Sequence, residues 1–163
     1  GKTPNMDLPL REDTEINLRL PALIPEKYLP DVHSRLVLYK RISNAENSNQ
    51  LRELQVEMID RFGLLPEQTK TLFRVTALKL RAEKLGIKKL DAGPEGGKIE
   101  FAQSTPVDPF TIVQLIQTEP HRYRLPTANQ LSFDEKMEAS ETRFQKVEQL
   151  FERLEQKIHG NAP

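Results

Sequence analysis

Proline and glycine divide this chain of 163 residues into short segments, and this division constrains the fold more than any other feature. Proline lacks a backbone donor, and glycine readily adopts the left-handed conformation that ends helices. The segments between these residues show either the apolar spacing of an amphipathic helix or the alternation of a strand. No internal repeat is visible. The sequence therefore predicts several short elements packed together.

Five segments have the helical pattern, and capping residues or a first-turn proline open most of them. They cover residues 32–43, 48–62, 66–85, 109–119 and 135–159. The third segment has apolar residues on so much of its surface that we expect it to pack on more than one neighbour.

Strand signals lie in five shorter segments, with Gly93 to Gly97 as a hairpin turn between the second and third. The segments are 16–20, 87–92, 98–102, 123–125 and 131–133. Helices and strands are grouped and do not strictly alternate, which favours an α+β fold. We expect a single compact domain of about five helices packed with short antiparallel strands.

The ends of the chain differ from its middle. Residues 1–14 are polar and contain Pro4 and Pro9, so they are predicted to be a linker or disordered arm. The domain is expected over 15–160, with a tail at 161–163. The first residues contain neither an initiator methionine nor a signal pattern, which suggests a piece of a longer protein. The apolar stretches are too short to cross a membrane.

Composition and motifs argue against several kinds of chemistry. The 24 basic and 24 acidic residues leave no net charge, which argues against a general nucleic-acid binder. Without cysteine there is no disulfide, no Cys-ligated zinc and no thiol nucleophile, and a reducing, cytoplasmic location fits best. The three histidines are too scattered for a local metal pair. We therefore expect no cofactor, no metal and no enzymatic activity in this fragment.

The glycine-rich turn before Lys98 invites comparison with a phosphate-binding loop. Ala92 stands where that motif needs its first glycine, and Ile99 stands where it needs a hydroxyl. The flanking residues are strand-like on both sides. The turn is therefore interpreted as part of a hairpin, and no nucleotide is predicted there.

Two charged stripes are the remaining candidates for function. Glu53, Glu57 and Asp60 share the side of the second helix that faces away from its apolar residues. Stacked like charges repel, so this stripe is either a solvated face or a docking surface for arginines of another domain. A candidate basic patch lies on the third helix, which is either a solvated face or a contact for nucleic acid or RNA polymerase. Its members are Lys70, Arg74, Arg81 and Lys84.

Several segments of the sequence also resemble a known family. They cover residues 20–32, 35–42, 57–66, 84–90, 97–102 and 123–125, and include LPALIPEKYLPDV and EMIDRFGLLP. In these segments the chain resembles the C-terminal domain of the bacterial transcription-repair coupling factor (Mfd) family. The resemblance runs from about Ile16 to the end of the last helix.

The resemblance implies a role that periodicity alone does not show. Members of that family are ATP-driven DNA translocases that remove stalled RNA polymerase from damaged DNA and recruit UvrA for nucleotide excision repair. Their motor motifs lie upstream of this fragment. The C-terminal domain is not catalytic; it clamps onto the UvrA-binding module of the same protein and represses it. Glu57 and Asp60 match the family's acidic contact with arginines of that module.

Overall fold

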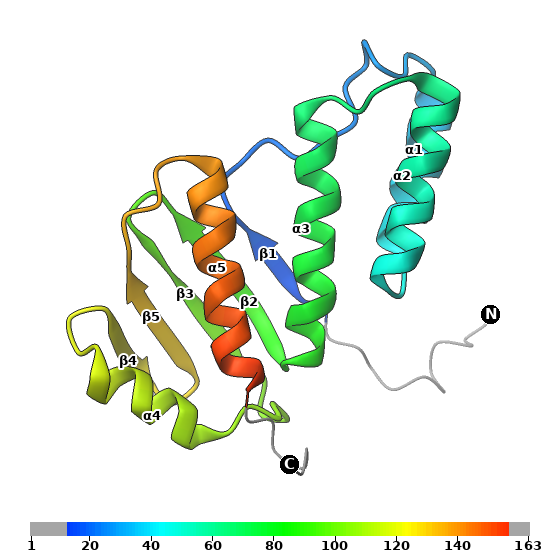
Figure 1. Ribbon diagram of the computed structural model, residues 1–163. Coiled ribbons are helices and arrows are strands. Elements are labelled where there is room, and N and C mark those ends of the chain that lie inside the picture. The colour runs from blue at the N-terminus through cyan, green and yellow to red at the C-terminus, as the bar shows by residue number, and fades with distance from the viewer. Residues whose placement is uncertain (1–12, 157–163) are drawn as a thin grey trace.

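Five helices and five strands lie within residues 13–156, the part of the chain that the computed structural model describes (Figure 1). The helices are α1 (Val32–Ser43), α2 (Ser48–Phe62), α3 (Glu67–Lys84), α4 (Pro109–Thr118) and α5 (Ser140–Glu155). The strands are β1 (Glu15–Asn17), β2 (Ile87–Gly93), β3 (Gly96–Phe101), β4 (Tyr123–Thr127) and β5 (Gln130–Asp134). The predicted α+β class with five helices is confirmed.

All five strands form one mixed sheet in the order β1-β2-β3-β5-β4. The predicted hairpin β2–β3 is antiparallel, as is the pair β4–β5, and β3 joins the two by pairing with β5. The first strand pairs with β2 in parallel. Parallel neighbours need a long connection between them, and helices α1, α2 and α3 supply it.

Two hydrophobic cores share α3. The larger core lies between the sheet and α5, which crosses the same face as α3 (Figure 1), and includes Leu90, Ile99 and Phe151. The smaller core lies among α1, α2 and α3. Phe73 packs in the smaller core, whereas Leu78 packs in the larger one. The prediction that this helix contacts more than one neighbour is therefore confirmed.

The last helix begins later than its sequence pattern predicts. Residues 135–139 are not helical: Glu135 N–H donates to the Glu95 carbonyl, and Met137 N–H donates to the Pro94 carbonyl at 2.7 Å. These long-range bonds compete with the helical ones and hold the segment against the β2–β3 turn. The predicted helical residues 157–159 lie outside the described part of the chain.

The first strand is also shorter than predicted. The first strand ends at Asn17 and not at Leu20, because Arg19 has a positive φ of 58° and its N–H donates to the Asn17 side chain. Thr14, assigned from sequence to the arm, is buried and donates its hydroxyl to the Ile87 carbonyl. Residues 1–12 of the predicted arm and the predicted tail lie outside the described residues. No helix within the described range is long and apolar enough to cross a membrane.

Candidate docking face on α2

The local sequence fixes which side of α2 faces solvent. Asn47 caps the helix by accepting a hydrogen bond from Gln50 N–H, and Gly63 ends it with a φ of 95°. Leu51, Leu54 and Met58 are buried against α1 and α3. An α-helix has 3.6 residues per turn, so Glu53, Glu57 and Asp60, which span two turns on the opposite side, must point outward.

Four residues make up this outward surface, which we call the docking face: Glu53, Val56, Glu57 and Asp60. The carboxylates of Glu53 and Asp60 are exposed, and 36% of the Glu57 side chain is accessible. Val56 lies between them and is 53% exposed. The predicted acidic stripe is thus on the surface, with one apolar residue inside it.

Glu57 is engaged within the chain itself. Arg41, from the last turn of α1, donates through both terminal nitrogens to the two carboxylate oxygens at 2.7 and 2.8 Å. Arg61, one turn further along α2, donates to Glu57 Oε2 at 3.1 Å. These two arginines, with the Arg41 hydrogen bonds as the largest cause, lower the pKa of Glu57 from 4.5 to about 2.

Glu53 and Asp60 have a different environment. Within residues 13–156, neither side chain has a hydrogen-bonding partner or an ion pair. The acidic stripe is therefore divided: its middle carboxylate is neutralised internally, whereas its outer two remain available to a cation from elsewhere.

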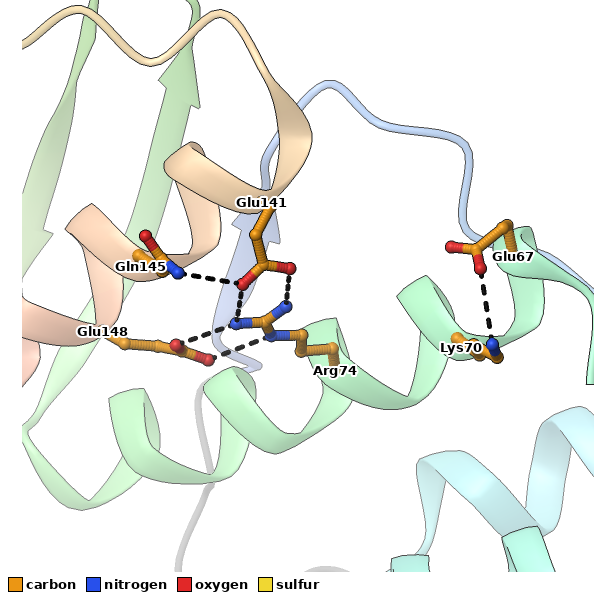
Figure 2. A network of polar contacts seen from close by, with 6 residues as sticks. All are labelled: Glu67, Lys70, Arg74, Glu141, Gln145 and Glu148. Carbon is orange, nitrogen blue, oxygen red and sulfur yellow. Dashed lines mark hydrogen bonds and ion pairs between the residues drawn. The ribbon is translucent and has the colours of Figure 1, made fainter.

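The four cations of the candidate basic patch do not form one open surface. Arg74 lies between Glu141 and Glu148 of α5, with bonds of 2.8 to 3.2 Å, and Lys70 contacts Glu67 (Figure 2). Arg81 pairs with Glu155 at 2.9 Å. Lys84 is exposed, with no ion pair in the described part of the chain.

These pairs join α3 to α5. Arg74 and Arg81 are seven residues apart, as are the successive glutamates that they meet, so the contacts repeat every two turns. Both guanidinium groups also lie over aromatic rings of α5; Arg74 is 4.4 Å from the Phe144 ring centroid. The predicted basic stripe thus has a structural partner that the sequence analysis did not find.

Comparison with known proteins identifies the region around this face. A family model described as the TRCF domain matches residues 18–112, which is more than half of the chain. The chain belongs to the TRCF domain family. The match contains all of α1, α2 and α3, and therefore both charged stripes.

Relatives of this TRCF domain are similar over most of its length. It is 41% identical to the transcription-repair-coupling factor of Escherichia coli K12 over 156 residues, which is 96% of this chain and 14% of that protein. The corresponding protein of Haemophilus influenzae is 48% identical over 124 residues, 76% of this chain and 11% of that protein. The match thus covers only about a seventh of the length of the Escherichia coli protein.

A solved structure shares the fold of this TRCF domain. The crystal structure of a C-terminal domain of transcription-repair coupling factor superposes with a TM-score of 0.74 and covers 92% of this chain and 99% of that one. Its sequence identity is 22%, so this comparison concerns the fold alone. The α+β fold expected from the grouping of helices and strands is therefore also supported by this comparison.

The low pKa of Glu57 in the TRCF domain can be tested directly. Because its folded pKa is about 2, below its ordinary 4.5, the stabilisation from this carboxylate is complete above about pH 4.5 and is lost as pH falls towards 2. A carboxyl-carbon NMR titration should give a midpoint near 2 for Glu57. Arg41→Gln should raise this midpoint more than Arg61→Gln, and a wild-type midpoint near 4.5 would contradict the geometry.

Proposed function

We propose that this chain is a non-catalytic regulatory domain of a transcription-repair coupling factor. Its docking face binds arginines of the UvrA-binding module in the same protein. Docking masks that module until the protein engages RNA polymerase. UvrA and RNA polymerase are therefore indirect partners of this domain, and the role belongs to transcription-coupled DNA repair.

One observation carries this proposal: α2 presents two exposed carboxylates that have no partner among the described residues, in a chain of the TRCF domain family. Each of these carboxylates can accept a cation from another module, because neither is compensated within the described part of the chain. Arginine fits best because its planar guanidinium can bind carboxylates through two parallel hydrogen bonds. The exposed Val56 adds a small apolar contact on the same face.

A mixed charged and apolar face suits a reversible contact. Interfaces between domains of one chain typically bury about 600–1,500 Å² and are comparatively polar. Removing one partner of a desolvated charge pair in such an interface costs about 2–5 kcal/mol. A few pairs are therefore enough to determine whether the closed or the open state dominates.

Masking would act through competition. UvrA binds only the open state, so its apparent association constant is the intrinsic one multiplied by the fraction of molecules that are open. A factor that favours the open state therefore strengthens UvrA binding. By linkage, UvrA strengthens the binding of that factor by the same free energy.

The proposal predicts the effect of reversing the two available charges. Glu53→Arg with Asp60→Arg in the full-length parent protein should raise UvrA affinity about tenfold or more, because the closed state loses two pairs. These positions are preferred to Glu57, whose reversal would also break its pair with Arg41. Pull-down or calorimetric titration with UvrA measures the effect.

A control reversal at a distant site separates docking from net charge, and it changes the net charge by as much as either single reversal, Glu53→Arg or Asp60→Arg. Glu95 is an exposed carboxylate in the β2–β3 turn whose side chain has no partner among residues 13–156, so Glu95→Arg changes the charge at a distant place. It should leave UvrA affinity unchanged. Unchanged affinity in the Glu53/Asp60 variant as well would exclude docking through this face.

The alternative is a contact for nucleic acid or RNA polymerase through the basic face of α3. It has weaker support because Arg74 and Arg81 are each held by glutamates of α5, and about a third of each side chain is exposed. Phosphate binding would have to displace these internal pairs. A steep salt dependence of DNA binding by the isolated chain would favour this alternative.

A further inference from the structure

The Arg41–Glu57 contact places an arginine of this chain where the proposed function requires an arginine of another module. Arg41 lies in the last turn of α1, and its guanidinium donates hydrogen bonds to both carboxylate oxygens of Glu57 on α2. This is the two-pronged geometry that an incoming arginine would also adopt. The described structure therefore shows the docking face with its central position already filled.

The remaining acceptor capacity of Glu57 is small. An ionised carboxylate offers about four lone-pair sites. Arg41 uses two of them and Arg61 uses a third, on Oε2. One site remains, which is too few for a second two-pronged contact. An external arginine can therefore form two hydrogen bonds to Glu57 only if Arg41 leaves.

The local charges lead to the same conclusion. Glu57 together with Arg41 and Arg61 carries a net charge of about +1 at neutral pH, which opposes an approaching cation. The attraction for that cation comes from Glu53 and Asp60. These two carboxylates and the Glu57–Arg41–Arg61 cluster together carry a net charge of −1. Removing the Arg41 charge would change this sum to −2.

We propose that Arg41 is an internal competitor for the docking arginine. In the open state it occupies Glu57, and in the closed state the partner's arginine displaces it. This exchange weakens the closed state and so keeps masking reversible. The inference rests on the proposed function, because it assumes that the docking face binds arginine.

The test compares two charge-neutralising substitutions on α1 in the full-length parent protein. Arg41→Gln should strengthen closure and so weaken apparent UvrA binding about two- to fivefold, the range that corresponds to a single exposed ion pair. Lys40→Gln is the matched control: Lys40 is the adjacent exposed cation and, within residues 13–156, has no ion pair. It should leave UvrA binding nearly unchanged.

The background variant Glu57→Gln makes the assignment specific. Arg41→Gln should have a clearly smaller effect on UvrA binding in that background, because the carboxylate for which Arg41 competes is gone and only the change in local charge remains. The difference between Arg41→Gln and wild type should also shrink at high salt.

Each other outcome has a distinct meaning. If Arg41→Gln changes nothing while Glu53→Arg with Asp60→Arg still raises UvrA affinity, docking stands and Arg41 is not a competitor. If Arg41→Gln raises UvrA affinity, Arg41 itself contacts the partner and the inference is overturned. If neither variant changes UvrA affinity, both docking and the inference are wrong.

Discussion

Replacing Arg143 by alanine is expected to lower the free energy of unfolding by about 3–5 kcal/mol, far more than a typical surface arginine. Arg143 is on α5, and only 3% of the residue is exposed. Its guanidinium donates to the Leu18 carbonyl at 2.7 Å and to the Met137 and Glu138 carbonyls at 3.0 Å. Alanine would remove all three bonds, and the two buried ones would leave the Leu18 and Met137 carbonyls without these donors.

The position of Arg143 explains why the effect should be large. Leu18 follows β1, whereas Met137 and Glu138 lie in the connection before α5. One side chain therefore links two segments, and Arg143 itself is 125 positions from Leu18. Among the described residues it has no carboxylate partner, so these carbonyls alone compensate for the burial of its charge. Loss of the side chain would loosen both segments at once.

Two further variants make this prediction specific. Arg143→Lys keeps the charge, but one ammonium cannot span three carbonyls, so an intermediate loss is expected. Arg153→Ala, on the same helix, removes a half-buried pair with Glu119 whose side chains are 41% and 31% exposed, and should cost about 1 kcal/mol. Urea unfolding followed by circular dichroism measures all three. Equal losses for Arg143→Ala and Arg153→Ala would contradict the proposed role.

The helices were predictable from sequence because their signals are local. Asp31 and Asn47 cap their helices, and Gly63 ends α2, as the capping pattern predicts. The start of α5 was not predictable in this way. Met137 continues the apolar spacing of the helix, yet its N–H bonds the Pro94 carbonyl, 43 positions earlier. No local pattern records such a bond.

The candidate site was predictable to the same degree. Spacing alone placed Glu53, Glu57 and Asp60 on one exposed face, and the i,i+4 rule would also have found the Arg61–Glu57 pair. The Arg41–Glu57 pair joins two helices, so it depends on how α1 and α2 pack. The same is true of Arg74 and the glutamates of α5: their spacings match in the sequence, but only the fold brings them together.

Gly96→Ala is the other substitution with a large expected effect, and the β2–β3 hairpin is where it should act. Gly96 has a φ of +139°, a conformation that side chains with a Cβ rarely adopt, and it pairs with Asp134 in β5. An added Cβ would collide with the Phe133 carbonyl oxygen and lie 3.0 Å from the Asp134 Cα. Backbone strain of about 1–3 kcal/mol adds to a steric cost of similar size, so the total loss should be about 3 kcal/mol or more.

Gly63→Ala provides the control that separates backbone strain from collision. Gly63 also has a positive φ, of +95°, but a Cβ there would meet nothing within 4 Å. This variant should therefore lose only the strain energy, about 1–3 kcal/mol. The Gly96 turn also holds the connection to α5 through the Pro94 and Glu95 carbonyls, so Gly96→Ala should increase amide exchange at Met137 as well. Equal losses of stability in the two variants, with Met137 exchange unchanged, would show that β3 and β5 can separate enough to accept a methyl group.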